Sequence, residues 1–144
     1  MKILVLNGPN LNILGKRKKE FYGISTLDNI NIILKDAAKK YDCQLLFFQS
    51  NHEGRLIDFI QKHAKSADGI LINPGALTHY GYSLHDALVD TKLPIVEVHL
   101  SDITKREDFR KIDVFDGIVI ERVMGKKEKS YEEGLEKLIK HIKK

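Results

Sequence analysis

The sequence predicts an α/β domain in which helices cover both faces of one parallel β-sheet. Short apolar runs of strand length alternate five times with segments of helical periodicity. Several of these runs are continuous rather than alternating, which is typical of strands buried on both faces. Polar residues follow four of the runs, at the strand ends beyond which such sheets bind ligands.

The length and composition are those of one soluble domain, and we expect residues 1–144 to form it. Hydrophobic residues make up 42% of the chain, charged residues 31%, and the formal net charge is +4. The single cysteine excludes an internal disulfide, which fits a reducing cytosol. No apolar run approaches the ~18 residues of a membrane span, and no signal peptide precedes the first strand. We therefore expect a cytoplasmic protein without membrane contact.

The first strand is expected at residues 3–6, a continuous apolar run that a glycine and a proline end. Residues 8–23 then form a long loop with three glycines. Loops of this length inside a compact domain are usually functional, and a mobile lid is the natural expectation. Ser25 and Thr26 favour the start of a helix, whose apolar residues continue at helical spacing to Tyr41.

The middle of the chain is expected to repeat this alternation. Residues 45–48 form the second strand, and Asn51 is a candidate cap for a helix with a continuous apolar face up to Ala64. The third strand is expected at residues 69–72. A Pro-Gly turn follows it and leads into a helix from about residue 77 to residue 89.

The last third is expected to add two strands and a long helix. Residues 95–98 form the fourth strand, a charged and short helical segment covers 104–111, and residues 117–120 form the fifth strand. Residues 130–133 read as a capping box. They open a final helix with apolar side chains at positions i, i+3, i+4 and i+7.

This alternation predicts a three-layer, flavodoxin-like fold with strand order 2-1-3-4-5. Parallel strands need right-handed crossovers, which leaves few possible topologies for five strands. In such a sheet the polar residues that follow the strands gather at one edge. That edge is the expected binding site.

The positive charge leaves three interpretations. Nucleic-acid binding is disfavoured, because acidic residues are interleaved with the lysines and no aromatic stacking pattern accompanies them. A solvated surface and the attraction of a small anionic substrate both remain. No phosphate-binding or dinucleotide-binding glycine motif follows the first strand. No metal site is expected either, because no ligand-pair spacing occurs among the candidate histidines, which are His52, His79, His85 and His99.

Three side chains suit acid chemistry at the strand ends. Glu97 and His99 lie two residues apart near a strand end, so their side chains point the same way. The carboxylate could orient the imidazole and keep it protonated, as a general acid requires, although a structural ion pair explains the pattern equally well. His79 follows the Pro-Gly turn, where a polar residue at a helix start is the simpler alternative.

Three further side chains suit base chemistry and anion binding. Tyr22 lies in the expected lid, and a tyrosine needs a nearby cation such as Arg17 before it can act as a base. A hydrophobic contact that fastens the loop is the simpler interpretation of Tyr22. Arg110 is suited to bidentate hydrogen bonding with a carboxylate. The alternative interpretation is an ordinary surface arginine on a helix.

Four segments match one enzyme family in order and spacing over roughly residues 1–110. They are LNGPNLNILG at 6–15 with Arg17 and Tyr22, FQSNHEG at 48–54, INPGALTH at 72–79, and PIVEVHLS at 94–101 with Arg106 and Arg110. Together they resemble the type II 3-dehydroquinate dehydratases. The resemblance implies a single catalytic domain that removes water from 3-dehydroquinate to give 3-dehydroshikimate in the shikimate pathway. It also implies an enolate intermediate, no metal and no cofactor.

The resemblance also assigns roles to residues. It implies Tyr22 as the base activated by Arg17, Asn10 as a holder of the water that stabilises the enolate, and His99, oriented by Glu97, as the general acid. The implied substrate-binding residues are Asn73, Gly75, His79, Asp86, Leu100, Ser101 and Arg110. Asp86 would reach a neighbouring subunit, because the family forms trimers assembled into a homododecamer.

Two alternatives remain. The first is a catalytically silent binding or assembly module with the same fold, which would have no need of both an acid and a base. The second is a related dehydratase that acts on a different cyclic hydroxy-ketoacid.

Overall fold

One parallel sheet with helices on both faces forms the structure, a computed structural model that describes residues 1–144. The strand order is β2-β1-β3-β4-β5, which confirms the predicted flavodoxin-like topology. The strands are β1 Lys2–Asn7, β2 Gln44–Gln49, β3 Gly69–Asn73, β4 Ile95–His99 and β5 Glu121–Met124. The helices are α1 Lys19–Tyr22, α2 Leu27–Lys39, α3 Glu53–His63, α4 Tyr82–Thr91 and α5 Lys129–Ile142. None of them is both long and apolar enough to span a bilayer.

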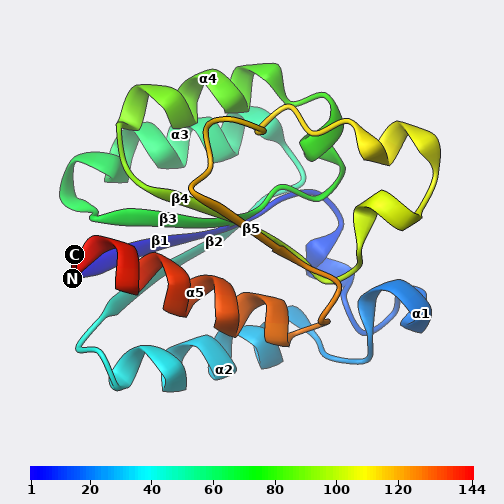
Figure 1. The fold of residues 1–144 in the computed structure, drawn as a ribbon, viewed down its shortest axis with the longest axis horizontal. Coiled ribbons are helices and arrows are strands. Elements are labelled where there is room, and N and C mark those ends of the chain that lie inside the picture. Colours follow the sequence, from blue (N-terminus) through cyan, green and yellow to red (C-terminus); the bar gives the residue numbers. More distant parts are fainter.

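The strands are held from both sides by two separate cores. In Figure 1, α3 and α4 lie above the sheet, and α2 and α5 lie below it. Successive side chains of a strand point to opposite faces, so Ile3 and Val5 of β1 join the core on the α2–α5 side, whereas Leu4 and Leu6 join the other core. All four side chains are fully buried, which explains the continuous apolar run. Packing on both faces of the sheet fixes the position of the carboxyl ends of the strands.

The prediction of the fifth strand is wrong in position. Residues 117–120 are irregular, and β5 begins at Glu121. Ile118 and Val119 pack against the core on the α3–α4 side, where Phe115 is fully buried. Their apolar character therefore reflects burial rather than a place in the sheet. β5 tolerates charged side chains because it is an edge strand that pairs only with β4.

Several helix starts also differ from the prediction. The helix expected over 77–89 is a 3₁₀ turn at Gly75–His79 followed by α4. Asn51 does not cap α3, because its Oδ1 accepts a hydrogen bond from the Asn10 amide at 2.9 Å. Ser130 lies inside α5, where its Oγ accepts from the Lys126 amide at 3.1 Å. The capping box expected at 130–133 is therefore wrong.

Other local expectations fare better. Thr26 caps α2, as predicted, through a reciprocal pair of hydrogen bonds with Asn29 at 3.0 and 3.1 Å. The segment 8–23, expected as an irregular loop, contains a 3₁₀ turn and the one-turn helix α1. The charged segment 104–111 is covered by two short 3₁₀ turns rather than one helix. These two segments supply the arginines of the site described below.

Candidate active site at the carboxyl ends of the strands

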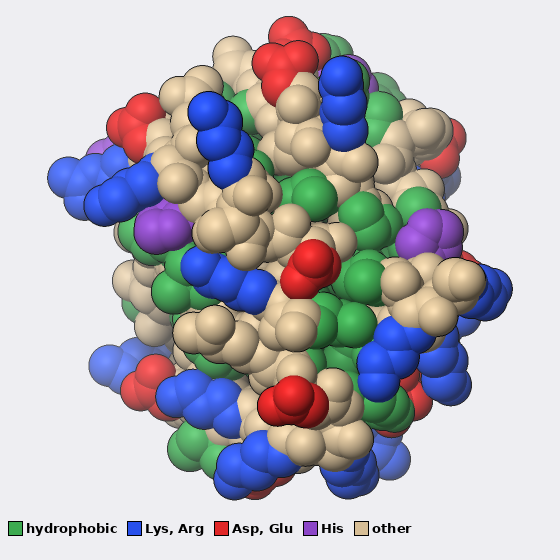
Figure 2. Space-filling model, turned by 90° about the vertical axis from the view of Figure 1, so that its left-hand side faces the viewer, with side chains coloured by type: hydrophobic (Ala, Val, Ile, Leu, Met, Phe, Trp, Pro, Cys, Tyr) green, Lys and Arg blue, Asp and Glu red, His purple; other side chains and the backbone are tan.

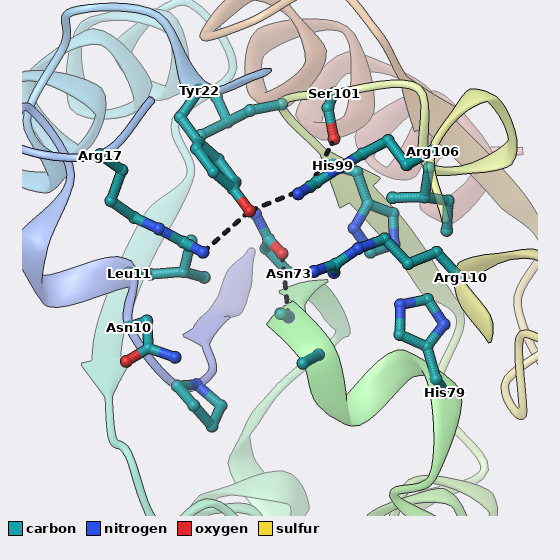
Figure 3. Close-up of a pocket in the computed structure, with 15 residues that line it drawn as sticks. Asn10, Leu11, Arg17, Tyr22, Asn73, His79, His99, Ser101, Arg106 and Arg110 are labelled. Carbon is teal, nitrogen blue, oxygen red and sulfur yellow. Dashed lines mark hydrogen bonds between the residues drawn. The ribbon is translucent and has the colours of Figure 1, made fainter. Parts of the chain in front are cut away.

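A cavity of about 120 Å³ opens beyond the carboxyl ends of β1, β3 and β4. Figure 3 shows side chains from distant parts of the chain converging on it. Ten of the predicted site residues line this cavity: Asn10, Arg17, Tyr22, Asn73, Gly75, His79, His99, Leu100, Ser101 and Arg110. Of the other two, Glu97 contacts His99 from behind, and Asp86 is not among the lining residues.

The Tyr22 hydroxyl oxygen accepts hydrogen bonds from two guanidinium groups. Nη2 of Arg17 lies 2.8 Å from this oxygen and Nη1 of Arg106 lies 2.9 Å from it (Figure 3). The Arg17 guanidinium is also 3.7 Å from the centroid of the Tyr22 ring. Burial lowers the pKa of Arg17, while the negative charge of an ionised Tyr22 opposes that change. Two cationic donors on one phenolic oxygen stabilise the phenolate, which is the form that accepts a proton.

Arg106 lines the cavity and contacts Tyr22, although the resemblance assigned no role to it. Its side chain is only 8% exposed, and its guanidinium lies 4.0 Å from the ring centroid of Phe21. Its Nη1 also reaches Ser101 Oγ at 3.4 Å. Its only signal in the sequence is its match to the family pattern in the fourth segment. Its contact with Tyr22 spans 84 positions, so no local pattern could predict it.

At the end of β4, His99 is paired with a buried carboxylate. His99 Nε2 lies 2.6 Å from Glu97 Oε1, and the Glu97 side chain is completely buried. Burial raises the pKa of Glu97, but His99, Asp113 and Arg122 together outweigh this effect through their hydrogen bonds and charges, and leave the pKa below its ordinary value. Nδ1 of His99 makes no hydrogen bond to the protein, so this nitrogen is available to a ligand in the cavity.

Asn73 is held at the cavity wall by two side-chain hydrogen bonds. Its Oδ1 accepts from the Gly75 amide at 3.1 Å, and its Nδ2 donates to the Tyr131 hydroxyl at 2.9 Å. That hydroxyl in turn donates to Asn7 Oδ1 at 2.6 Å. Gly75 has φ +61°, a conformation that few other residues adopt. A Cβ at Gly8 would lie only 2.2 Å from the Pro74 carbonyl oxygen, so glycine there lets the two turns touch.

His79 and Arg110 form the remaining polar wall. His79 Nδ1 lies 2.6 Å from the Ile112 carbonyl oxygen, so this nitrogen carries a proton and donates it. Burial lowers the pKa of His79, and the nearby Arg110 charge adds to that effect. The neutral ring then presents Nε2 as an acceptor. Arg110 Nε is bound to Glu107 Oε2 at 2.6 Å, which leaves its terminal nitrogens for an anion.

Positive charge is concentrated at the cavity. Arg17, Arg106 and Arg110 all line it, whereas no carboxylate does. On the face that carries the chain termini, Figure 2 shows lysines and arginines spread among acidic side chains. The lysines there form a mixed solvated surface, while the cavity is suited to a small anion.

Comparisons with known proteins agree with the fold. The family described as dehydroquinase class II matches residues 1–139. A 3-dehydroquinate dehydratase of Geotalea daltonii is 49% identical over all of both chains, and that of Roseiflexus castenholzii is 55% identical over 87% of this chain and 80% of its own. The crystal structure of a type II dehydroquinase from Butyrivibrio crossotus has a TM-score of 0.92 at 41% identity, covering 96% of this chain and 97% of that chain. The chain belongs to the class II dehydroquinase family.

Among the residues that the resemblance to class II dehydroquinases singled out, Asp86 alone lies apart from the cavity and its supports. It is on α4, its side chain is 80% exposed, and its Oδ1 is 3.0 Å from Nδ1 of the adjacent His85. Within one copy of the chain it contributes nothing to the site.

Two carboxylates and an imidazole lie close together behind the cavity, and such a cluster is a candidate metal site. Ligand atoms of Glu97, His99 and Asp113 lie within 4.8 Å of one another. However, Arg122 already supplies a cation there, with Nε 3.1 Å from Glu97 and Nη2 2.7 Å from Asp113. A metal ion would meet the repulsion of this guanidinium, so the three residues do not form a metal site.

Proposed function

We propose that the chain dehydrates 3-dehydroquinate to 3-dehydroshikimate through an enolate, as a step of the shikimate pathway for aromatic amino acids. Membership of the class II dehydroquinase family supports this reaction. One observation carries it: a single cavity joins the doubly cation-bound Tyr22 hydroxyl and the carboxylate-paired His99. Elimination through an enolate needs a base for the carbon-bound proton and an acid for the leaving hydroxyl.

In the first step, Tyr22 as phenolate takes a proton from the carbon next to the ketone. The electrons of that C–H bond form a carbon–carbon double bond, and the π electrons of the ketone move to its oxygen, which gives the enolate. Arg17 and Arg106 keep the phenolate stable before the transfer. Asn10, which lines the cavity in a left-handed turn, holds the water that stabilises the enolate oxygen.

In the second step, the enolate electrons return and the carbon–oxygen bond to the leaving hydroxyl breaks. His99 gives this hydroxyl a proton, so that it departs as water. Glu97 favours the protonated imidazole, because a buried negative charge at 2.6 Å stabilises imidazolium. The acid and the base are thus different residues with opposite electrostatic surroundings.

The remaining lining residues are proposed to hold the substrate. The free terminal nitrogens of Arg110 suit its carboxylate. Asn73, His79, Ser101 and the Leu100 backbone suit its hydroxyl and carbonyl oxygens. The turn at Gly75 brings Asn73 and the backbone close to the cavity.

An ultraviolet assay for enone formation from 3-dehydroquinate tests the reaction, with borohydride added to a parallel sample. We expect turnover in both samples, because the enolate route forms no lysine Schiff base that borohydride could trap. Absence of turnover by the folded protein would favour the silent binding module instead. Conversion of another cyclic hydroxy-ketoacid in preference to 3-dehydroquinate would favour the related dehydratase.

We also propose that residues 1–144 act as one cytoplasmic catalytic domain that assembles as trimers into a dodecamer, with Asp86 reaching the site of a neighbouring copy. The exposed Asp86 carboxylate supports this role, since it has no function within its own copy. Tyr80 and Tyr82 nearby are 58% and 67% exposed, and such large aromatic side chains are common in interfaces.

A further inference from the structure

Behind the proposed acid His99 lies a buried network of charges that the reaction described above does not use. Arg122 on β5 is the register partner of Glu97 on β4, so the two side chains are direct cross-strand neighbours. Arg122 Nε donates to Glu97 Oε2 at 3.1 Å, while Glu97 Oε1 contacts His99. The Glu97 carboxylate is therefore held between a guanidinium on one side and an imidazole on the other.

Asp113 adds a second carboxyl group to the same network. Its Oδ2 lies 2.7 Å from Arg122 Nη2, its Oδ1 accepts from the Phe115 amide at 2.8 Å, and its side chain is only 7% exposed. Burial, together with the neighbouring Glu97 charge, raises the pKa of Asp113 to about 7. Near neutral pH, Asp113 is therefore divided between a neutral form and an ionised form.

Both residues act from behind the site rather than in it. Neither Arg122 nor Asp113 lines the cavity, so neither can bind substrate directly. We propose that Arg122 and Asp113 are positioning residues, which hold Glu97 against His99 and set the pH range in which His99 works as the general acid. The proposal rests on the proposed role of His99.

The charges around His99 determine the expected direction. On its own strand Glu97 contacts His99 directly, and a carboxylate oxygen of Asp113, from the segment after residue 111, lies within 4.8 Å of the His99 ring nitrogen. Arg122 on β5 contacts Glu97 and Asp113. His79 and Arg110 lie on the two turns beside the cavity. As pH falls below about 7, the neutral form of Asp113 predominates, and the charges of Glu97 and Arg122 offset each other. Above pH 7, ionised Asp113 adds a negative charge, which favours retention of the imidazolium proton.

The Asp113→Asn variant isolates this effect, because asparagine mimics the neutral carboxyl group and cannot ionise. We expect the basic limb of its kcat–pH profile to move to lower pH by about one unit, the usual scale for one nearby charge. KM should stay within about twofold of the parent protein, since Asp113 does not touch the cavity.

The Arg122→Lys variant separates charge from geometry. Lysine keeps the positive charge, but with a single nitrogen it cannot contact Glu97 and Asp113 in the geometry of the two guanidinium nitrogens. We expect kcat to fall about tenfold or more with little change in KM, as for loss of an interaction made in the transition state. Glu121→Gln is the matched control, because Glu121 is the adjacent residue on β5 and pairs at the surface with Lys137 at 3.3 Å.

An NMR titration of His99 in the same variants gives a readout that does not require turnover, with the resonance assigned from a His99→Asn variant. We expect the midpoint of the His99 titration to be lower in Asp113→Asn than in the parent protein and unchanged in Glu121→Gln. Superimposable titrations and pH profiles for parent and Asp113→Asn would overturn the proposal. If the parent protein has no dehydratase activity but the titration shifts as expected, the network stands and the proposed function fails.

Discussion

The hydroxyl of Tyr131 links the scaffold to the site, and its removal tests that link. The Tyr131→Phe substitution keeps the ring in a fully buried position of α5 but deletes the oxygen that joins Asn7 to Asn73. Both amides are buried, with 1% and 3% of their surfaces exposed. Each buried polar group left without a partner costs about 1–3 kcal/mol.

The magnitude follows from these two contacts. Two buried amide groups left without a partner would together lower the free energy of unfolding by about 2–6 kcal/mol. Part of this loss is offset, because the variant no longer has to bury the polar hydroxyl of Tyr131. Asn7 and Asn73 are register partners on β1 and β3, so a direct contact between their side chains would recover more. We therefore expect unfolding free energy to fall by about 2–3 kcal/mol, which lowers Tm by roughly 6–9 °C in a chain of this size.

Urea denaturation at one fixed protein concentration measures the loss, because assembly makes apparent stability depend on concentration. Tyr41→Phe is a matched control, since the Tyr41 hydroxyl makes no hydrogen bond to the protein and its ring is only half-buried. We also expect a higher KM for Tyr131→Phe, because Asn73 loses a fixed contact. A loss of less than about 0.5 kcal/mol would refute the reasoning, since it would mean that the two amides need no bridge.

Three further predictions concern the base, the assembly and the pH dependence of stability. Tyr22→Phe should lower kcat by about 10²–10⁴-fold without weakening substrate binding. Steady-state kinetics measures the loss of kcat, and calorimetry measures substrate binding. Activity equal to that of the parent protein would exclude Tyr22 as the base. Asp86→Ala should weaken assembly or raise KM; unchanged sedimentation together with unchanged KM would remove its proposed role in a neighbouring copy. Because the folded-state pKa of Asp113 is raised to about 7, its contribution to stability is fully present below pH 4 and is lost as pH rises through 7. Denaturation of parent and Asp113→Asn at pH 5 and pH 8 should therefore show a smaller loss in the variant, and equal losses would contradict the assignment.

The predictions from sequence succeeded where a local pattern reports burial directly. The fully buried runs of β1 and β3 predicted two-sided strands, and both strands lie inside the sheet. The same logic misplaced the fifth strand, because Ile118 and Val119 are buried under the α3–α4 core without belonging to the sheet. Apolar periodicity cannot distinguish these two forms of burial.

The residues of the site also fall into two groups: those that the sequence indicated and those that only the structure showed. The resemblance singled out the residues that line the cavity, including Tyr22 and His99. It gave no role to Arg106, and neither Asp113 nor Arg122 stood out by type or spacing. Arginine and aspartate are ordinarily surface residues, so only their neighbours in space reveal that these three are largely buried and paired.

The sequence by itself determined the alternation of strands and helices, the parallel sheet, and the edge at which polar side chains gather. These features depend on the order and periodicity of nearby residues, which a linear chain displays directly. Only the tertiary structure decided which distant groups meet there: Tyr131 with Asn7 across 124 positions, and Arg122 with Glu97 across 25. Such contacts arise when packing brings separate segments together, and no local pattern encodes their distances or the protonation states that follow from them.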